Sequence, residues 1–527
     1  MKNRTLEITS TPIFVGLIGH RDINESEIPS LQREFDRRLG EILLIAADTP
    51  VVILTPLAKG ADRLAQSSSL RSRIKICAVL PLKKNDYEKD FKKGKERQEF
   101  QAALKEADFV IETPWNVDVQ SFTASRDRRD SYEACGHWIS DRSSILFALW
   151  DGNEERGRGG TASTIQYRNS QSSVTAGHLD TYQLIHIYSS NSGSNIYTEC
   201  ICGGHDSNLA KIEKFIFEFN RLNHLLTFDS RAKDSAYVQI FTAADKVAGV
   251  KQTEFRRKTK TVLILGALGV NFASITQDTF NLIWFSSTLM AFLFTSWYFF
   301  RFKRLRTKEL YESCRLIAEV LRIDIWLKAC DFESGVERVL IGSTEIDVNV
   351  RGFLMSVFSL ETITGSTMME SSNPLAWIKN QVDYLEGAKG KPGAIQRNLA
   401  VSKKIKLATL VSSIAGIIAF LSIPVLTYQF HIDQSSWILM TEKTLFTILL
   451  SASAVFAAYR EISGLDEIAA RFARSSERFH TAIRSYGQSK RPEERRAIIL
   501  QVASESLAET GRWYQVKHDK DVQPFQS

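Results

Sequence analysis

Residues 13–22 read IFVGLIGHRD, a short apolar run that ends in a glycine and three polar residues. Similar runs recur between residues 12 and 190 and are separated by helical patterns such as residues 27–46. The further runs are Val51–Leu54, Ile74–Leu80, Phe109–Ile111, Ile145–Trp150 and Leu184–Tyr188. Strands that alternate with helices predict a parallel sheet with helices on both faces, an α/β Rossmann-like amino-terminal domain.

Ligands of such a sheet bind at the carboxyl ends of its strands, and three groups of glycines and polar residues stand there. The first group is Gly19, His20, Arg21 and Asp22, the second is Lys59, Gly60, Ala61 and Asp62, and the third is Asp151, Gly152, Gly159, Gly160 and Thr161. Because parallel strands end at one edge of the sheet, we expect the three groups to form one site.

These residue types suit a phosphorylated ligand. Gly19 lets the backbone approach a ligand closely, and Arg21 can bind a phosphate with two parallel hydrogen bonds. Gly60 is expected to open the next helix, whose free amides suit an anion, while Asp62 can accept hydrogen bonds from ribose hydroxyls. A diglycine followed by Thr161 at a helix start is a pattern that cradles phosphate.

Each group also has a purely structural interpretation. Asp22 would cap a helix, Asp151 and Gly152 would form a turn, and the glycines after them would form a loop. His20 is open as a ligand contact, a packing residue or a general base. Because three such groups follow three strands of one sheet, the sequence favours a nucleotide-type ligand.

Four long apolar stretches occupy the second half of the chain. They are residues 261–277 and 280–300, with Asp278 between them, and residues 407–427 and 444–459, the last beginning as early as Trp437. Each approaches the roughly 20 residues that cross a bilayer core as a helix. The sequence therefore predicts an all-α region of four spans in two hairpins. The open alternative is four buried core helices of a soluble protein.

Lysines and arginines stand on one side of these spans. They are Lys251, Arg256, Arg257, Lys258 and Lys260 before the first hairpin, Arg301, Lys303, Arg304, Arg306 and Lys308 after it, and Lys403, Lys404, Lys406 and Arg460 around the second. The two turns contain Asp278 and Asp433, and Lys443 if it joins the second turn. The positive-inside rule therefore predicts that both termini are cytoplasmic.

Amphipathic patterns predict long cytoplasmic helices at residues 305–331, 463–485 and 492–514. Each hairpin is thus followed by such a helix, which suggests two related modules. The predicted units are a nucleotide-sensing domain (1–190), a linker with pre-membrane helices (191–260), the first hairpin with its cytoplasmic helix (261–331), a cytoplasmic connector (332–402), and the second hairpin with the carboxy-terminal helices (403–527).

Composition narrows the function classes. Six cysteines scattered over 527 residues do not make a disulfide scaffold and fit a reducing compartment. Cys200, Cys202 and His205 lack a fourth zinc ligand at a sensible spacing, so we expect no metal site. The net charge of +7 suggests nucleic acid, but the basic clusters stand at span ends, where lipid accounts for them. We therefore expect no nucleic-acid partner.

Four motifs in order, GHRD, AKGADRL, the helix from Tyr132 to Gly136, and FALWDG with GRGGTA, resemble the SLOG domain over residues 12–190. This nucleotide-sensing branch of the Rossmann-like group includes the LOG cytokinin-activating hydrolases and DNA-processing protein A. The resemblance adds Tyr132 to the expected ligand-binding residues. Shorter matches in the second half resemble the membrane-spanning SLATT modules of bacterial antiphage systems. They are Ala244, Asp245, Trp377, Gln381, Tyr384, Glu509 and Trp513.

One departure from this family affects the expected activity. LOG hydrolases carry PGGxGTxxE with a catalytic glutamate, whereas the stretch here is Gly159-Gly160-Thr161-Ala162-Ser163-Thr164, with no acid three residues after Thr161. Without that acid, glycosidic cleavage lacks its catalytic group. The resemblance therefore implies a sensor that has no catalytic residue and no cofactor, and that binds a cyclic nucleotide or an ADP-ribose derivative.

The sequence and the resemblance together predict an effector in the bacterial inner membrane. A nucleotide second messenger from a partner synthase would bind the sensor, rearrange a homo-oligomer, permeabilise the bilayer and arrest growth. Two alternatives stay open. One is a membrane-tethered nucleotide hydrolase or glycosidase that uses Asp22, Asp62 or Asp151, and the other is a ligand-regulated ion channel.

Overall fold

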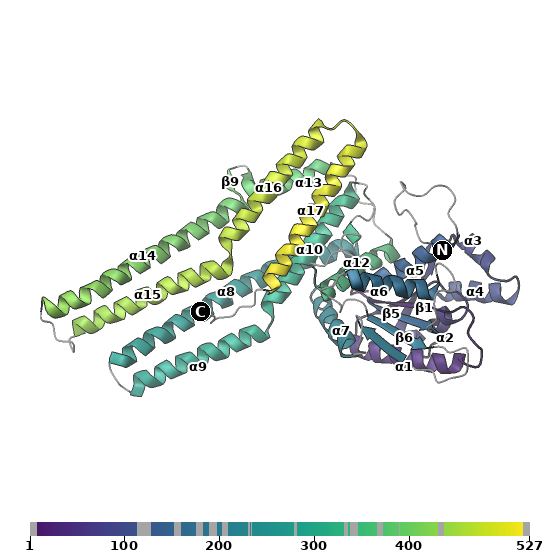
Figure 1. Cartoon of the computed structure of the whole chain (residues 1–527), viewed down its shortest axis with the longest axis horizontal. Helices are drawn as coiled ribbons and strands as arrows, with labels where there is room; N and C mark the ends of the chain where they lie inside the picture. The colour runs from purple at the N-terminus through teal and green to yellow at the C-terminus, as the bar shows by residue number, and fades with distance from the viewer. Residues whose placement is uncertain are drawn as a thin grey trace.

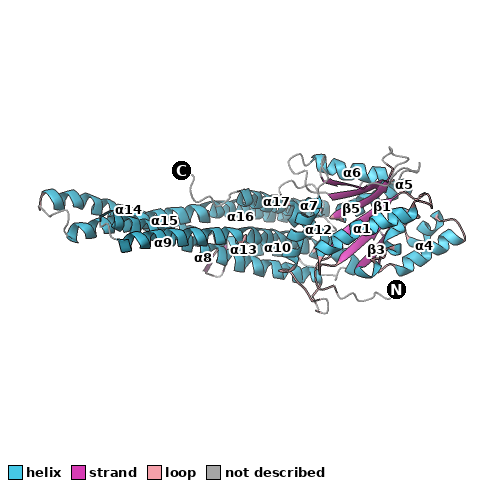
Figure 2. Ribbon diagram, turned by 90° about the horizontal axis from the view of Figure 1, so that it is seen from below, coloured by secondary structure: helices cyan, strands magenta, loops and turns pink. Residues whose placement is uncertain are grey.

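The computed structural model describes residues 8–519 except 113–127, 152–159, 175–182, 189–197, 203–208, 230–231, 233, 279–281, 331, 333–335, 338–345, 366–372, 389 and 431–436. Figure 1 shows an α/β domain at one end and an arm of long helices at the other. The view in Figure 2 shows that the arm helices run nearly parallel to one another along the length of the molecule. The predicted α/β domain followed by a helical region is confirmed.

A seven-stranded sheet forms the centre of the α/β domain, in the order β4-β3-β2-β1-β5-β6-β7. The strands are β1 (Ile13–Gly19), β2 (Val51–Thr55), β3 (Ile74–Leu80), β4 (Phe109–Glu112), β5 (Ile145–Trp150), β6 (Gln183–Tyr188) and β7 (Thr198–Cys202). The first six are parallel, and in the register of β1, Val15 stands between Ile53 and Ile145. Strand β2 is buried along its whole length, as expected for a parallel sheet that is covered on both faces.

Strand β7 is the one strand of this sheet that the sequence pattern did not predict. It pairs antiparallel with β6 and continues the sheet beyond residue 190, the boundary expected for the domain. Its sequence, TECIC, has no apolar run. A strand at the edge of a sheet has a partner on one side only, so it needs less apolar character than a central strand.

Helices pack on both faces of the sheet. The longer ones are α1 (Ile28–Ala46), α4 (Lys95–Glu106), α5 (Arg128–Arg142), α6 (Thr161–Val174) and α7 (Leu209–Asn223). Short turns of helix follow the second and third strands, namely η1 (Ala61–Arg63), α2 (Leu64–Ser67), η2 (Arg71–Arg73), α3 (Lys84–Tyr87) and η3 (Glu88–Asp90). Helix α1 matches the pattern predicted for residues 27–46 and buries Leu31, Phe35 and Leu39 on its core face.

Two helical hairpins form the arm. They are α8 (Ala236–Asp278) with α9 (Leu282–Arg304), and α14 (Ala394–Tyr428) with α15 (Trp437–Ser463), so the early start of the fourth stretch at Trp437 is confirmed. Helices α8 and α15 pack against each other and join the hairpins. The base of the arm consists of α10 (Thr307–Ala329), α13 (Pro374–Glu386), α16 (Leu465–Gln488), α17 (Pro492–Asp519), and the short ribbon of β8 (Gly387–Ala388) and β9 (Lys391–Pro392).

Each hairpin turns into the helix that follows it through a residue in the left-handed conformation. Arg306 stands before α10 with φ 46° and ψ 34°, and Gly464 stands before α16 with φ 56° and ψ 34°. This left-handed conformation costs a non-glycine residue roughly 1 kcal/mol. The Arg306 side chain forms ion pairs with Glu218 and Glu309, which hold it there. The shared geometry supports the suggestion of two related modules.

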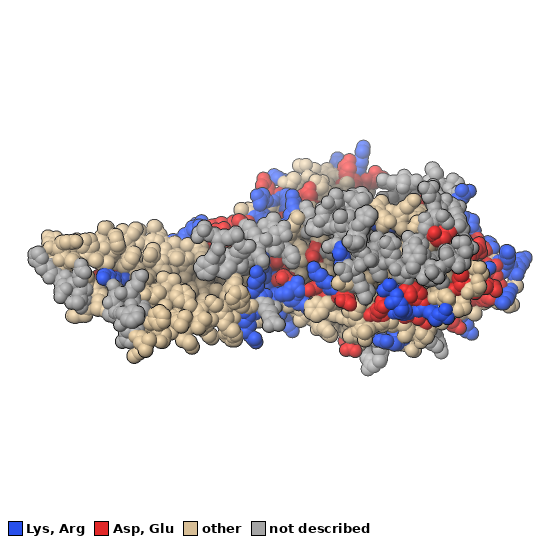
Figure 3. All heavy atoms as spheres, turned by 60° about the horizontal axis from the view of Figure 1, so that its bottom comes forward, with Lys and Arg blue, Asp and Glu red and all other residues tan. Residues whose placement is uncertain are grey.

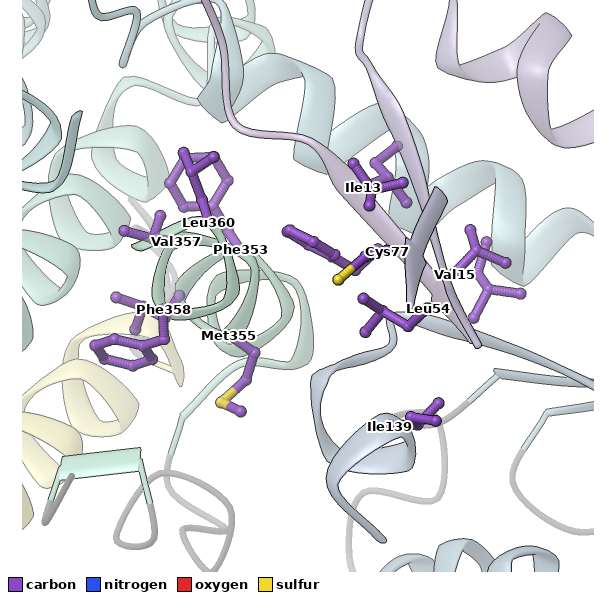
Figure 4. Packing of buried hydrophobic residues seen from close by; sticks show 14 of the residues in the cluster. Ile13, Val15, Leu54, Cys77, Ile139, Phe353, Met355, Val357, Phe358 and Leu360 are labelled. Atoms are coloured by element: carbon purple, nitrogen blue, oxygen red, sulfur yellow. The ribbon is translucent and has the colours of Figure 1, made fainter. Parts of the chain in front are cut away.

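Helix α12 (Val348–Thr364) lies between the sheet and the arm, inside the segment expected to be only a connector. Figure 4 shows Phe353 of this helix facing the sheet, near Ile13 and Cys77, while Phe358 points to the other side. Both phenylalanines are fully buried. A helix that is apolar on all sides must be enclosed by other elements, and α12 is enclosed by the sheet, α7, α8 and α10.

Polar contacts hold α12 to the arm. Lys328 of α10 forms ion pairs with Glu361 of α12 and, at 2.7 Å, with Asp324. Tyr237 of α8 donates a 2.5 Å hydrogen bond to the same aspartate. One cation and two carboxylates from α10 and α12 therefore meet a tyrosine from α8 beside a buried apolar contact.

We predict that Phe353→Ala destabilises the α/β domain by about 3–5 kcal/mol, because it removes a fully buried ring from the contact between α12 and the sheet. Chemical denaturation of the full chain in detergent measures the loss. Phe217→Ala is the matched control, since that ring is 63% exposed on α7. An equal loss in both variants would contradict the role of α12.

Candidate functional site

The site lies at the point in the sheet where successive strands stop being added on one side of β1 and start being added on the other. From β1 the chain adds β2, β3 and β4 on one side and then returns to place β5 on the other side of β1. The carboxyl ends of β1 and β5 are the topological switch point, where open α/β sheets bind ligands. The first predicted group follows β1 and the third follows β5.

His20 and Asp151 meet at this switch point. The His20 Nε2 atom lies 3.1 Å from the Asp151 carboxylate and 3.3 Å from the Asp151 backbone nitrogen. One ring nitrogen serves only one of these partners at a time, and the shorter contact corresponds to Nε2–H donating to the carboxylate. His20 thus contacts Asp151 at the strand end, and its role as ligand contact, packing residue or general base stays a prediction.

Glycines bring the loops after β1 and β2 into contact. Gly60 has φ +87°, and a Cβ atom there would stand 2.5 Å from the carbonyl oxygens of both His20 and Arg21. The Ala61 amide donates a 3.1 Å hydrogen bond to the His20 carbonyl. A side chain on Gly19 would collide with Ala61. The first and second predicted groups are therefore adjacent, as expected.

Asp62 is buried beneath these loops. Its side chain is 3% exposed, and its Oδ1 atom has no hydrogen-bond partner in the part of the chain that the structure describes. Burial raises the pKa of Asp62 from 3.8 to about 7, although Arg21 and the amides of Ala58 and Gly19 act to lower it. The carboxyl group is therefore half-protonated near neutral pH and has hydrogen-bonding capacity to spare.

Two tyrosines complete this cluster. The rings of Tyr87 and Tyr132 stand 6.1 Å apart, and the Arg21 guanidinium lies 5.2 Å from the centre of the Tyr132 ring. Neither buried phenolic oxygen has a hydrogen-bond partner among the described residues. Burial raises the pKa of Tyr87. The Arg21 charge acts to lower this pKa, and the Asp62 charge acts to raise it. We call Arg21, Asp62, Tyr87 and Tyr132 the inner cluster.

Tyr87 was missed at the level of sequence. It follows β3 on the short helix α3, at the same edge of the sheet as the predicted groups. No glycine motif marks this position in the sequence, because β3 is followed by Pro81 and Leu82. Applying the carboxyl-end rule to every strand would have included it.

The expected helix after Gly60 is short. Gly60 precedes only the three-residue turn η1 and the four-residue helix α2, so the strong helix dipole expected at this point is absent from the observed fold. Lys59, Arg21 and Asp22 are exposed around it. Asp22 does not cap α1, whose N-cap residue is Glu27. Charge near a ligand therefore comes from side chains and not from this helix.

The third group does stand at a helix start. Helix α6 begins at Thr161, and the Thr164 amide donates a 3.1 Å hydrogen bond to the Gly160 carbonyl. Gly136 of α5 lies so close to Thr164 that a Cβ atom would collide with its hydroxyl. Gly152, Gly159 and all the residues between them lie outside the described residues.

No group of three or more His, Cys, Asp or Glu side chains suited to a metal ion occurs among the described residues. Cys200 and Cys202 have described backbones only, and His205 lies outside the described ranges. The prediction about a zinc site there therefore stays a prediction.

The residues quoted for the second-half resemblance gather at the base of the arm. Asp245 forms 3.1 Å ion pairs with Arg315 and Arg322. Glu509 accepts hydrogen bonds from Ser475 and Arg478 on α16. Trp377 stacks on Trp326 at 4.3 Å, and the Trp513 ring meets Tyr311 edge-on. Tyr384 is half exposed.

The arm exposes a large apolar surface. Two helices in the described part of the chain are long and apolar enough to cross a membrane, α14 with a mean hydropathy of 2.2, and α15 continuing into α16 with 1.4. Only 17% and 6% of their apolar windows are buried. Figure 3 shows that charged side chains gather over the α/β domain and the base of the arm, while the visible far part is mostly neutral. Such exposure indicates association with a membrane.

Two spans, and not the predicted four, meet this test. Of the first hairpin, the side chains of residues 275–281 and of residue 284 lie outside the description. Those that are described are exposed and apolar along α9, for example Ile283, Met290 and Phe300 at 72%, 66% and 68%.

Polar side chains join the two hairpins inside the arm. Asn271 of α8 donates a 2.9 Å hydrogen bond to Ser451 of α15, and Ser274 lies 3.0 Å from Thr447. Hydrogen bonds of this kind hold helices together where there is no water to compete.

Comparison of the chain with models of protein families, with curated proteins and with solved structures finds no match.

We predict that the stability of the wild type relative to Asp62→Asn falls as pH rises from about 4 to 7. The folded state holds the proton of Asp62 more tightly than the unfolded state, because its pKa is raised to about 7. Stability is therefore lost as the carboxyl ionises, by up to about 4 kcal/mol. Thermal denaturation of both proteins across this pH range measures the difference.

Asp36→Asn is the matched control and has the opposite sign. Partial burial acts to raise the pKa of Asp36, but hydrogen bonds from Ser68, Ser69 and Gln32 lower it overall. The wild type therefore gains stability over Asp36→Asn as pH rises. If the difference in stability between the wild type and Asp62→Asn does not change with pH, Asp62 is not buried.

Proposed function

We propose that this chain is a membrane-embedded effector of a bacterial antiphage defence system. Its SLOG-like α/β domain binds a nucleotide-derived second messenger, made by a partner synthase, and the bound form rearranges a homo-oligomer that permeabilises the inner membrane and arrests growth. The observation that carries this proposal is the inner cluster, because three buried polar atoms without a partner among the described residues gather there, at the edge of the sheet where ligands bind.

The chemistry of the site supports a nucleotide. Asp62, Tyr87 and Tyr132 offer buried hydrogen-bonding atoms to the hydroxyls of a sugar or the edge of a base. Arg21 and Lys59 are exposed beside them and suit phosphate. Thr161 starts a 14-residue helix whose free amides also suit an anion.

Four spans fit the exposed apolar surface of both hairpins. A soluble hairpin would bury the apolar faces of α8 and α9, yet Leu268, Leu289 and Leu293 are about half exposed. Lipid would cover them as it covers α14 and α15. Both termini and the α/β domain then lie in the cytoplasm, as the positive-inside rule predicts.

A path of contacts leads from the site to the arm. Tyr132 lies on α5, and α5 packs on α12. Arg142 at the end of α5 forms an ion pair with Glu337, and Lys328 links α12 to α10. A ligand that moves α5 would therefore shift elements that are continuous with the first hairpin. The ligand biases opening only by its differential affinity for the two states.

One observation favours a second candidate function, a membrane-tethered nucleotide hydrolase or glycosidase. A carboxyl group whose pKa is raised to about 7 by burial is suited to general acid–base catalysis. Asp62 would be that group. Chromatography of nucleotides after incubation with the protein separates the two functions, because a sensor returns its ligand intact.

We predict that liposomes containing the protein release a trapped dye only when the correct nucleotide is added. A thermal-shift screen of cyclic nucleotides and ADP-ribose derivatives selects the nucleotide. Arg21→Ala should weaken the nucleotide's affinity about 10- to 100-fold, because a hydrogen-bonded charge pair is lost.

Arg33→Ala is the control for this experiment, because Arg33 is exposed on α1, is not part of the inner cluster, and bonds only Ser30 among the described residues. It should respond like the wild type. Leakage that is indifferent to Arg21→Ala would count against the sensor assignment.

We predict that cysteines at Leu282 and Phe430 react with an impermeant maleimide on intact spheroplasts, whereas a cysteine at Lys490 reacts only after lysis. Leu282 and Phe430 stand at the far ends of the two hairpins, and Lys490 lies between α16 and α17. Labelling of the wild-type chain measures the background reaction of its six native cysteines. A Leu282→Cys variant that reacts only after lysis would reduce the number of spans from four to two.

A further inference from the structure

Two large apolar side chains are exposed on adjoining helices of the α/β domain. Leu44 of α1 is 79% exposed and Phe217 of α7 is 63% exposed, more than any other large apolar side chain that the structure describes in this domain. The two helices pack together, and Asn220 of α7 donates hydrogen bonds to the carbonyls of Ile45 and Ala46 at the end of α1. Leu44 directly precedes Ile45. Phe217 lies less than one helical turn before Asn220, so both apolar side chains stand beside the same helix contact.

The same side of α7 binds the start of the arm. Glu218 forms an ion pair with Arg306, which stands between α9 and α10, and Arg221 donates a 3.3 Å hydrogen bond to the Arg306 carbonyl. Arg221 follows Phe217 by four residues and therefore lies on the same face of α7. Figure 1 shows α7 at the edge of the α/β domain nearest the arm. Phe217 thus stands on the face of α7 that meets the arm.

This contact lies close to the level at which α9 would leave the membrane. The predicted span ends at residue 300, and the exposed Arg301 follows it. Arg306 comes five residues later, which corresponds to about 7.5 Å along a helix. The headgroup layer on each side of the hydrocarbon core is about 5–7 Å thick. The contact between α7 and Arg306 is therefore at the outer limit of the headgroup layer.

Leu305 extends the apolar surface toward the span. It directly precedes Arg306 and is 47% exposed, and Phe300 at the end of the span is 68% exposed. Exposed apolar side chains thus occur on the span, at the turn after it, and on the two helices of the α/β domain next to that turn. A single exposed leucine is normal, whereas a series that continues from a membrane span indicates contact with lipid.

We propose that the α/β domain lies on the surface of the bilayer that holds the arm, with Phe217 and Leu44 inserted among the lipid headgroups. Apolar side chains in this position are buried at the boundary between headgroups and acyl chains. Lys214 is exposed on the same face of α7, one turn before Phe217, where its ammonium group can pair with a lipid phosphate. The domain is then held at two places, by the arm and by lipid.

A second copy of the chain is the competing occupant of this surface. A single helix with its side chains is about 10 Å across, which exceeds the thickness of the headgroup layer. A neighbouring copy would have to displace headgroups to reach Phe217, whereas lipid already surrounds the end of α9. The position of the surface therefore favours lipid over protein.

The experiment uses the full chain in liposomes of phosphatidylethanolamine and phosphatidylglycerol, with a nitroxide on a fraction of the headgroups. An environment-sensitive fluorophore is attached to Leu44→Cys, to Phe217→Cys or to the control Lys95→Cys. The Lys95 side chain is 92% exposed on α4, which Figure 1 shows at the end of the domain away from the arm. Labels at positions 44 and 217 should shift to shorter wavelength and be quenched by the nitroxide, and the label at position 95 should do neither. The labelled wild-type chain gives the background of the native cysteines.

A charged residue next to the label tests the role of the apolar side chains. Leu44→Glu in the chain labelled at Phe217→Cys should weaken the quenching, because a carboxylate is costly at the edge of the acyl chains. Ile28→Glu is the matched control, since Ile28 is also an exposed apolar residue of α1 but lies about 24 Å from Leu44 along the helix. It should leave the quenching unchanged, and circular dichroism checks that every variant is folded.

This inference rests on the membrane insertion of the arm in the proposed function, and a label at Leu289→Cys separates the two. Leu289 is half exposed on α9 and should be quenched by a nitroxide placed deep in the acyl chains. If no label is quenched, the arm is not inserted and the proposed function fails. If position 289 is quenched and positions 44 and 217 are not, the lipid contact of the α/β domain alone is overturned. A wavelength shift at position 217 without quenching, together with cysteine cross-linking between copies, would identify a second copy as the occupant and also overturn it.

Discussion

The burial of α12 is the constraint on which the rest of the molecule depends. This helix has apolar side chains around its whole circumference, so no single partner can cover it. Phe353 packs toward the sheet, and Phe358 packs toward Tyr237 of α8. An apolar contact on each side makes the α/β domain and the base of the arm one packed body. The α/β domain is therefore not joined to the arm by a linker alone. A change of shape in this domain is resisted or transmitted by the arm.

The strands of the sheet could be predicted closely because each is a short apolar run bounded by polar residues. Ile74–Leu80 and Ile145–Trp150 match β3 and β5 residue for residue. The same reasoning missed β7 and α12, for opposite reasons. Strand β7 has too little apolar character to be noticed, and α12 has so much that it shows no periodicity. Its partners, such as Phe219, which contacts Phe353, are far away in the sequence.

The site was predictable in position but not in chemistry. The carboxyl-end rule placed the loops after β1, β2 and β5 at one edge of the sheet, and glycines such as Gly60 explain why two of these loops touch. Sequence alone does not reveal that Asp62 is buried, because burial depends on how elements far apart in the sequence pack together. Nor does the sequence reveal that the His20 side chain contacts the Asp151 carboxylate. Both facts arise from tertiary contacts.

The energetics of the inner cluster set what a ligand can achieve. Three buried atoms, on Asp62, Tyr87 and Tyr132, have no partner among the described residues, and each costs roughly 1–3 kcal/mol while it stays unpaired. A ligand that pairs them in only one conformation gains that free energy in that conformation alone. Shifting a two-state equilibrium almost completely takes about 5.5 kcal/mol of differential binding, so one fully paired site lies near this threshold. Two sites in the homo-oligomer of the proposed function would exceed it, because their contributions add when both copies change together.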